Sequence, residues 1–408
     1  MRGTPISVIV VSRDRPDDLA LCLLSLSQQY HHPFEVIVVA DPVTIAGLWD
    51  TPLSDKLKLV EFAEENISAA RNAGLAQAAG EILAFIDDDA VAEPTWLEHL
   101  SAPFSDGDVS AVGGFVLGRN GLSLQWGARS IDGQGFHHDL PFSGGDWQCP
   151  DPGPGRAVKT EGTNSALRRS VLASLGGFDR GFRFFHDEAD LNVRLARAGH
   201  RTAIAPRALV HHKSAASKRR TAERRPSDLF EIAASSALFA RKHDPSGELD
   251  GTLAARRDEE RKRLLQHMVR GSCEPRDVAR LLGTFDAGVA DGKTRSFQKE
   301  RIADPAAAFL PMNEAPPERS HEILAGRSWQ KRRLCRQARA IVSAGRGATV
   351  FCFSPTSLYH RVRYCPGGFW LQTGGLFGRS DRRQPVFRLF NLKIRVAEEC
   401  RRLTDIRT

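Results

Sequence analysis

A short apolar run that ends in three consecutive carboxylates most constrains the fold of this chain. Residues 82–86 read Ile-Leu-Ala-Phe-Ile, and Asp87, Asp88 and Asp89 follow at once. A continuous apolar run of this length is typical of a central strand that is covered on both faces. Ligands in open α/β sheets bind beyond the carboxyl ends of the strands. The acidic triplet is therefore predicted to lie at a binding edge of a sheet.

Earlier apolar runs predict further strands, and segments with helical patterns separate them. The predicted strands are residues 6–11, 34–39 and 57–62. Strands that alternate with helices predict an α/β fold with a doubly wound, mainly parallel sheet. Polar residues follow two of these strands, namely Ser12 with Arg13 and, further on, Asp41. We expect them to line the same nucleotide crevice as the acidic triplet.

The acidic triplet itself has two interpretations. Three adjacent carboxylates repel one another, and oxygen ligands suit a hard cation such as Mg²⁺ or Mn²⁺. The alternative is a solvated acidic loop before a helix that starts near Pro94. The turn after the first strand lacks the glycine patterns of dinucleotide-binding folds and of P-loop enzymes. We therefore expect phosphate charge to be met by a metal and by side chains such as Arg71.

A second group of acids lies at the predicted start of a helix. Asp187, Glu188 and Asp190 precede an apolar helical stripe, and Asp187 is placed to cap the helix. Asp190 and Arg194 are four residues apart and are expected to pair on the helix surface. One interpretation is that these acids simply complement the helix N-terminus. The other is that one carboxylate faces the crevice and acts as a general base.

Five motifs, in this order, resemble family 2 glycosyltransferases, which have the GT-A fold. The motifs are Val11–Pro16, Ser68–Gly74, Asp87–Asp89, Gly162–Arg169 and Gly176–Asp179. In the first motif Arg13 and Asp14 depart from the Tyr-Asn that the family usually has. The resemblance covers roughly residues 5–215. It implies an inverting transfer of a sugar from a nucleotide diphosphate donor.

The resemblance also implies roles for individual residues. Asp87 and Asp89 would hold the metal together with His211, and His212 is the alternate ligand. Imidazole fits Mn²⁺ better than Mg²⁺. The family places its base at the second acid of Glu-Asp-x-Asp, which is Glu188 here, with Asp187 as the alternative. The expected donor-binding residues are Ser12, Arg13, Arg15, Asp41, Arg71, Asn72, Asp87 and Asp88, and the expected acceptor-side residues are Asn164, Gly177, Phe178 and Asp179.

The expected partners follow from the same resemblance and from the charge. A UDP-sugar is the favoured donor, ahead of dTDP- and GDP-sugars, and a glycan or lipid-linked glycan is the favoured acceptor. The net charge of +8 favours anionic partners, although we expect no nucleic acid among them. Two alternatives are a sugar nucleotidyltransferase, which the first turn disfavours, and a non-catalytic nucleotide-sugar or glycan-binding module, which the two acidic groups disfavour.

The chain is expected to contain three parts. These are a GT-A glycosyltransferase domain at 1–228, a mostly helical extension at 229–346, and a small C-terminal segment at 347–408 to which no chemistry is assigned. Residues 133–155 are rich in Gly, Pro and Asp and are expected to form a loop over the donor or acceptor.

The sequence also carries expectations about the compartment. The seven cysteines are scattered, which favours a reducing cytosol. No apolar run has the length of a membrane span, and the N-terminus leads straight into a strand, so we expect a cytoplasmic protein without a signal peptide. A basic run at residues 218–225 is expected to close on the donor diphosphate or to contact the inner face of a membrane. A solvated linker is the alternative.

Overall fold

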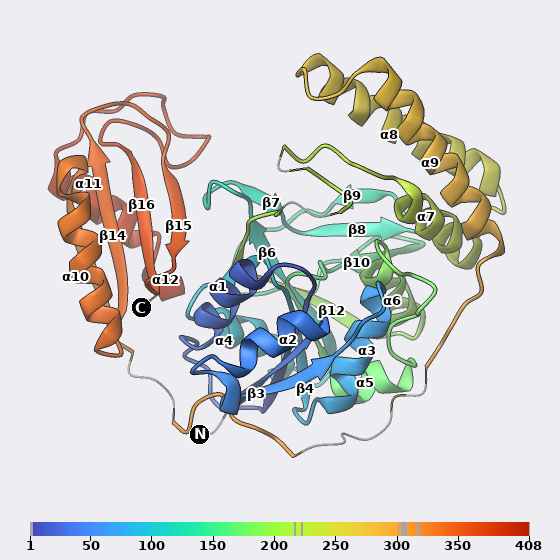
Figure 1. Ribbon diagram of the computed structural model, residues 1–408, viewed down its shortest axis with the longest axis horizontal. Helices are drawn as coiled ribbons and strands as arrows, with labels where there is room; N and C mark the ends of the chain where they lie inside the picture. The colour runs from blue at the N-terminus through green and yellow to red at the C-terminus, as the bar shows by residue number, and fades with distance from the viewer. Residues whose placement is uncertain are drawn as a thin grey trace.

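The computed structural model describes residues 3–215, 218–221, 223–300, 302, 308–315 and 319–407. Figure 1 shows an N-terminal α/β domain, a layer of helices on one side of it, and a C-terminal α/β unit on the other. Among the described residues, none of the helices combines the length and the apolar character that crossing a membrane would require.

The large sheet of the N-terminal domain confirms the predicted doubly wound, mainly parallel arrangement. Its spatial order is β3 (Leu57–Glu61), β2 (Phe34–Ala40), β1 (Ile6–Ser12), β4 (Ile82–Asp87), β11 (Ser165–Arg168), β6 (Val109–Leu117), β12 (Arg201–His212) and β5 (Ala90–Ala92), with β7 (Leu124–Trp126) paired to β6. The first four strands are parallel, and β11 is antiparallel to both of its neighbours. The chain order reverses between β1 and β4, where Val11 pairs with Asp87. Ligands bind at such a switch point.

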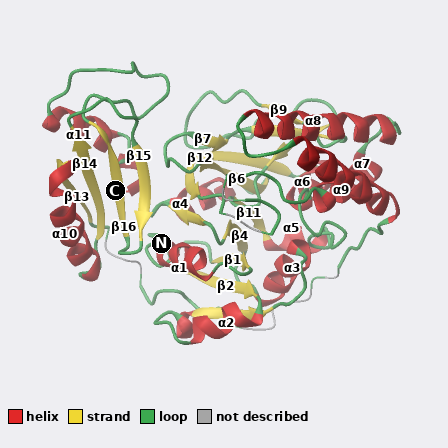
Figure 2. Ribbon diagram, turned by 45° about the horizontal axis from the view of Figure 1, so that its top comes forward, coloured by secondary structure: helices red, strands yellow, loops and turns green. Residues whose placement is uncertain are grey.

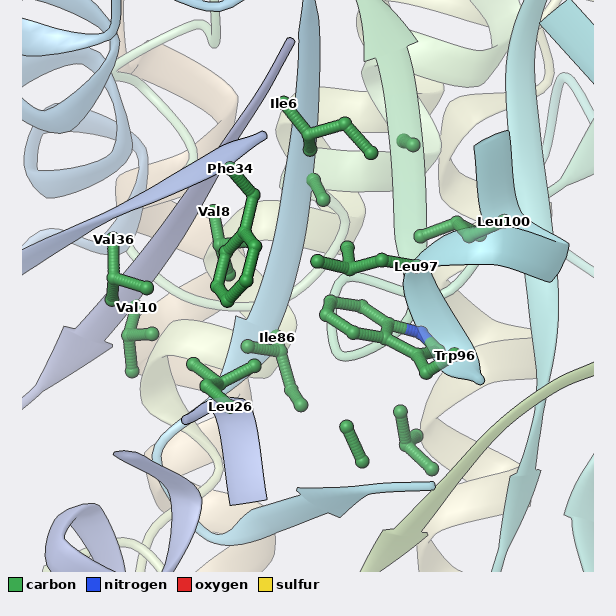
Figure 3. Close-up of a cluster of buried hydrophobic side chains, with 14 of the residues drawn as sticks. Ile6, Val8, Val10, Leu26, Phe34, Val36, Ile86, Trp96, Leu97 and Leu100 are labelled. Carbon is green, nitrogen blue, oxygen red and sulfur yellow. The ribbon is translucent and has the colours of Figure 1, made fainter. Parts of the chain in front are cut away.

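Helices cover both faces of this sheet. They are α1 (Pro16–Leu26), α2 (Pro42–Trp49), α3 (Ile67–Gln77), α4 (Trp96–Ser101), α5 (Arg169–Ser174) and α6 (Asp187–Arg197), with 3-10 turns η1 (Ser54–Lys56) and η2 (Ala102–Ser105). Because strand side chains alternate between faces, Val8 and Val10 lie on one face in the same buried cluster as Trp96, as Figure 3 shows. Ile9 packs with Phe85 on the other face. This alternation buries every residue of β1 except Val11, which is partly buried, and fixes the position of its carboxyl end.

A smaller sheet lies over the second acidic segment. Its order is β10 (Arg156–Lys159), β8 (Arg129–Asp132) and β9 (His137–Asp139). The expected loop at 133–155 contains β9, and its aromatic residues pack on the domain. Phe142 lies edge-on to Phe115 at 5.9 Å, and Trp147 packs against the main core.

The remaining elements form the helical layer and the C-terminal unit. They are α7 (Phe230–His243), α8 (Leu249–Val269) and α9 (Pro275–Thr294), then β13 (His321–Arg327), η3 (Ser328–Gln330), α10 (Lys331–Ser343), β14 (Gly347–Ser354), β15 (Arg361–Cys365), β16 (Phe369–Gly375), α11 (Leu392–Arg401) and α12 (Thr404–Arg407). The sheet of the C-terminal unit has the order β13-β14-β16-β15. Because β13 pairs with β14 along its whole length, this unit begins at His321 in the structure rather than at residue 347.

The C-terminal unit packs directly on the N-terminal domain. Figure 2 shows its sheet beside α1. Gln28, just after α1, donates a hydrogen bond to the Gly368 carbonyl (2.9 Å) and accepts one from the Tyr364 hydroxyl (2.9 Å). The backbone N–H of Val362 donates to the Asn120 carbonyl (2.8 Å). These contacts bring the last quarter of the chain close to the carboxyl ends of the main sheet.

Candidate active site

The acidic triplet lies at the switch point of the sheet, and its middle member, Asp88, is bound by other side chains of the protein. Asp88 is buried, accepts a hydrogen bond from the Ser12 hydroxyl (2.7 Å) and pairs with Arg15 (2.9 Å). Burial raises the pKa of Asp88 to about 7, although Arg15 and Ser12 act in the opposite direction. Of the two outer carboxylates, only that of Asp87 is partly exposed, whereas the side chain of Asp89 is 2% exposed and contacts Arg15 and His212. The side chain of Asp87 is 34% exposed.

Asp87, Asp89 and His212 form a cluster that suits a divalent cation. Each offers one ligand atom, and these atoms lie within 4.8 Å of one another. Asp89 is 3.2 Å from Nε2 of His212. Two carboxylate oxygens and one imidazole nitrogen match the preferences of Mn²⁺, and oxygen ligands also suit Mg²⁺. The residues present therefore fit the cation that the sequence predicts.

The structure brings His212, rather than the favoured His211, to the aspartates. Successive side chains of a strand point to opposite faces, so only one of the two histidines can face Asp89. His212 pairs with Ala90, which directly follows the acidic triplet. The other ring nitrogen of His212 lies 3.3 Å from the side chains of Gln125 and Ser214, which orient the ring. The structure therefore places the alternate residue, His212, in the candidate metal cluster.

His211 belongs instead to a buried network with the C-terminal unit. Its Nε2 is 2.7 Å from Glu93, and Arg407 grips both oxygens of Glu93, each at 2.7 Å. The guanidinium of Arg407 stacks on Trp370 (4.1 Å), whose ring also contacts His211 (4.5 Å). Burial opposes ionisation of Glu93, but Arg407 and His211 lower its pKa to about 2. This network fixes the end of β12 beside His212.

Arg71 on α3 connects the acidic triplet with the second group of acids. One guanidinium nitrogen contacts Asp187, and another lies 3.6 Å from Asp87 and donates to the Gly162 carbonyl (3.2 Å). The guanidinium also packs on the Phe178 ring at 5.4 Å. Burial would lower the pKa of Arg71, but Asp187 and Asp87 more than offset that effect and raise it. Arg71 is therefore charged and holds the two acidic groups close together.

The second group of acids contains one buried and one more accessible carboxylate. The Asp187 side chain is 4% exposed and pairs with Arg71, whereas that of Glu188 is 19% exposed. Lys159, at the end of β10, reaches Glu188 (3.2 Å) and Glu161 (2.8 Å). Sequence reasoning missed Lys159. A lysine in a strand just before the Gly162 motif was the signal that could have found it.

The pKa values of Asp187 and Glu188 shift in opposite directions. Burial and the neighbouring charge of Glu188 raise the pKa of Asp187 against the effect of Arg71. Burial would also raise the pKa of Glu188, but Lys159 and Arg71 lower it. Glu188 is therefore the member of the pair that more readily carries the negative charge, and a general base must be unprotonated.

The turn before α6 aims these acids. Phe185 and His186 both have positive φ angles, of 70° and 63°. Residues other than glycine rarely adopt this conformation, and such strain clusters at functional sites. His186 is the N-cap of α6 and makes no side-chain cap hydrogen bond. Asp187 is therefore the first helical residue rather than the cap that the sequence predicts.

Asp190 has a structural role. Its predicted pair with Arg194 is confirmed at 2.8 Å, but both side chains are buried rather than on the helix surface. Asp190 also contacts Lys242 (2.7 Å) and His243 (2.8 Å) of α7. Burial opposes its ionisation, but these cations and His243 hold the pKa of Asp190 well below its usual range. Asp190 therefore anchors the helical layer to α6.

Three expected donor-binding residues are engaged within the protein. Arg13 donates to the carbonyls of Phe62 (3.3 Å) and Glu64 (2.7 Å). Asp41 caps α2 by accepting from the backbone N–H of Thr44 (3.0 Å). Asn72 accepts from the N–H of Phe178 (2.9 Å) and donates to its carbonyl (2.8 Å). In the structure these side chains shape the loops around the crevice.

The four expected acceptor-side residues, Asn164, Gly177, Phe178 and Asp179, are all buried. Asn164 accepts from the Trp96 indole (2.8 Å) and donates to two backbone carbonyls. Asp179 pairs with Lys242 (2.6 Å) of α7. These four residues therefore lie in the packed interior rather than on an open surface, because they make contacts within the protein.

Part of the expected basic run reaches the acidic triplet. Arg220 lies 3.4 Å from Asp89, which Arg15 also approaches at 3.2 Å. Lys218 pairs instead with Glu65 at 2.7 Å. Two arginines therefore stand beside the carboxylate that borders the candidate metal site.

Known proteins resemble the chain over this same region. A family model described as glycosyl transferase family 2 matches residues 7–176. The O-antigen biosynthesis protein RfbC of Myxococcus xanthus is 35% identical over 236 residues, which are 53% of this chain and 18% of that protein. The glucosyl-dolichyl phosphate glucuronosyltransferase of Haloferax volcanii is 27% identical over 226 residues, which are 51% of this chain and 69% of that protein.

Among solved structures, GalNAc-T7 with UDP, GalNAc and Mn²⁺ matches with a TM-score of 0.42 and 15% identity. That match covers 52% of this chain and 44% of GalNAc-T7. The family match agrees with the strand order and with the position of the acidic triplet at the sheet switch point. Over residues 7–176 the chain is therefore similar to glycosyl transferase family 2, and the architecture of this region is consistent with a GT-A fold.

Proposed function

We propose that the chain is an inverting, metal-dependent glycosyltransferase that uses a nucleotide diphosphate sugar. The observation that carries this proposal is the position of Arg71 between Asp87 and Asp187. One guanidinium thus lies between the candidate metal cluster and the two acids that include the candidate general base. Asp87 and Asp187 are 100 residues apart in the sequence. A sugar donor held by the first group would present its anomeric carbon near the second.

Asp87, Asp89 and His212 would hold the cation in the proposed site. A bound Mn²⁺ or Mg²⁺ would supply positive charge to the departing diphosphate. Arg15 and Arg220 stand beside Asp89 and can add to that charge stabilisation.

Glu188 is the proposed general base. Its carboxylate is anionic and more accessible than that of Asp187, which Arg71 occupies. The acceptor hydroxyl oxygen forms a bond to the anomeric carbon while the bond to the diphosphate oxygen breaks, and the hydroxyl proton passes to Glu188. A single displacement of this kind inverts the configuration at the anomeric carbon. Lys159 holds the Glu188 carboxylate in position.

The substrate class extends the proposal. A UDP-sugar is the first donor to test, followed by dTDP- and GDP-sugars. The names of two relatives refer to O-antigen biosynthesis and to a dolichyl phosphate-linked sugar. They support a glycan or lipid-linked glycan as the acceptor of this chain.

A panel of nucleotide sugars with Mn²⁺ tests the proposal. One donor should raise the thermal unfolding midpoint and be hydrolysed slowly, and EDTA should remove the hydrolysis. Asp89→Ala should do the same, whereas Asp139→Ala, at a carboxylate that is 95% exposed, serves as the matched control. Full turnover in EDTA would overturn the metal assignment. Binding of a nucleotide sugar without turnover, even with glycan acceptors, would favour a binding module.

A further inference from the structure

The charge of the chain is divided unevenly between its parts. Residues 321–408 contain 18 Lys and Arg but 5 Asp and Glu, a net charge of +13. Residues 1–320 contain 39 Lys and Arg and 44 Asp and Glu, a net charge of −5. The basic character of the whole protein therefore comes from the C-terminal unit. Such asymmetry indicates an anionic surface as a partner of that unit.

Three connections of the C-terminal unit share one edge. Because β13, β14 and β16 are parallel, the segments that follow them emerge at the same end of the sheet. In Figure 1 this end is the upper end of the orange and red unit. We call residues 328–333, 354–361 and 376–394 the basic apolar edge. It contains nine Lys and Arg and one acid, Asp381.

The same edge exposes large apolar side chains. Among the described residues, six of the eleven exposed large hydrophobic side chains lie on it: Trp329, Leu358, Val386, Phe387, Leu389 and Ile394. Trp329 is 73% exposed and Leu389 is 78% exposed. Single exposed apolar residues are ordinary, but a concentration of them marks an interaction surface.

We propose that the basic apolar edge docks on the anionic surface of a lipid bilayer. Lysine and arginine are attracted to headgroup phosphates, while exposed apolar side chains enter the boundary with the acyl chains. Trp329 has an amphipathic ring of the kind found at membrane interfaces. The amphipathic helix α10 continues the basic surface, because Leu334, Ala338 and Ile341 face the core and the intervening Arg336 and Arg339 are exposed.

The composition of the edge favours a bilayer over a nucleic acid. Single-stranded nucleic acids are bound on aromatic platforms among cations. Four of the six exposed apolar side chains here, those of Leu358, Val386, Leu389 and Ile394, are aliphatic and offer no stacking surface for bases. Docking of this edge would hold the N-terminal domain near a lipid-linked acceptor, and only this last consequence rests on the proposed function.

Vesicle flotation of the full chain tests the inference. Binding to vesicles of phosphatidylcholine with phosphatidylglycerol should exceed binding to phosphatidylcholine alone and should weaken with added salt. Arg382→Ser with Arg383→Ser should lower the partition coefficient about 30-fold, since each cation near the surface contributes about fivefold. The matched control is Arg261→Ser with Lys262→Ser on α8, which removes two exposed cations elsewhere. Its partition coefficient should stay close to that of the unmodified chain.

A second variant separates apolar insertion from simple charge attraction. Phe387→Ser with Leu389→Ser should lower binding at least about tenfold and leave the thermal unfolding midpoint unchanged, because both side chains are exposed. Equal loss in the α8 control, or equal binding to both kinds of vesicle, would overturn the inference. So would the absence of vesicle binding together with tight binding of a labelled oligonucleotide. Hydrolysis of the nucleotide sugar in solution should survive in both edge variants, so a failure here is distinct from a failure of the proposed activity.

Discussion

Replacing each of the two adjacent histidines by alanine should separate metal binding from structural support. His212 faces Asp89 at 3.2 Å, whereas His211 faces Glu93 at 2.7 Å. The two side chains have the same chemistry and neighbouring positions, so each variant is the matched control of the other. His212→Ala removes one of three candidate ligands, and His211→Ala removes one partner of a buried carboxylate.

The structure sets the expected sizes of the two effects. Loss of a group that merely orients a ligand costs about 10–100-fold in metal affinity, so loss of His212 itself should cost about 100-fold or more. His211→Ala leaves Glu93 with both hydrogen bonds from Arg407. It should therefore cost about 1.5–3 kcal/mol in the free energy of unfolding, the value of a hydrogen bond to a charged group. Its metal affinity should change by less than about tenfold.

Calorimetric titration of Mn²⁺ in the presence of UDP measures the affinities, and urea denaturation measures the unfolding free energies. Metal binding that is lost in His211→Ala and retained in His212→Ala would refute the assignment of His212 as the metal ligand. It would instead support His211 as the ligand.

Three further predictions concern buried charge. Arg71→Met should lower the unfolding free energy by about 3–5 kcal/mol in urea denaturation, because it leaves Asp187 buried without its cation; an unchanged value would contradict the bridge. Arg407→Ala should destabilise by a similar amount, and adding Glu93→Gln should recover part of the loss, since a neutral amide tolerates burial better than an unpaired carboxylate. Glu93 has a folded pKa of about 2, below its value of 4.5 when unfolded, so its contribution is complete above pH 4.5 and is lost as the pH falls toward 2. Glu93→Gln should flatten the dependence of the unfolding free energy on pH in that window. An equally steep dependence would show that another group titrates there.

The strands and the acidic triplet could be predicted because local patterns carry them. Residues 82–86 are apolar without interruption, and β4 spans Ile82–Asp87. Segments with helical patterns are predicted between the strands, and α3 is one of the helices found there. Hydrophobic periodicity and turn residues act over a few positions, so the sequence alone is sufficient to recognise them.

The choice between the two histidines could not be made locally. A shift of one residue along a strand moves a side chain to the other face, and neighbouring apolar residues do not fix that register when both faces are buried. Only the pairing of His212 with Ala90 decides it. In the same way, Asp179 in the motif at residues 176–179 is expected on the acceptor side. In the structure it pairs with Lys242 of α7, a helix that follows much later in the chain.

The contribution of the C-terminal unit was hidden by distance along the chain. Arg407 and Glu93 are 314 residues apart, and neither lies in a pattern that indicates a partner. The boundary expected at residue 347 separated β13 from β14, because a short strand with intermediate burial has a weak apolar signal. Contacts of this kind depend on tertiary packing, which can override local preference.

Whether Glu188 takes the proton of the acceptor is tested by comparing the turnover of Glu188→Gln with that of Asp187→Asn. Both variants keep the shape of the side chain, and donor binding is measured in each by calorimetry with UDP and Mn²⁺. Glu188→Gln should bind the donor normally and lose about 10²-fold or more in kcat. Asp187→Asn should mainly lose stability, because the Asp187 carboxylate pairs with Arg71. Near-normal turnover of Glu188→Gln on a verified acceptor would contradict the account, and a selective loss of turnover in Asp187→Asn would move the base to Asp187.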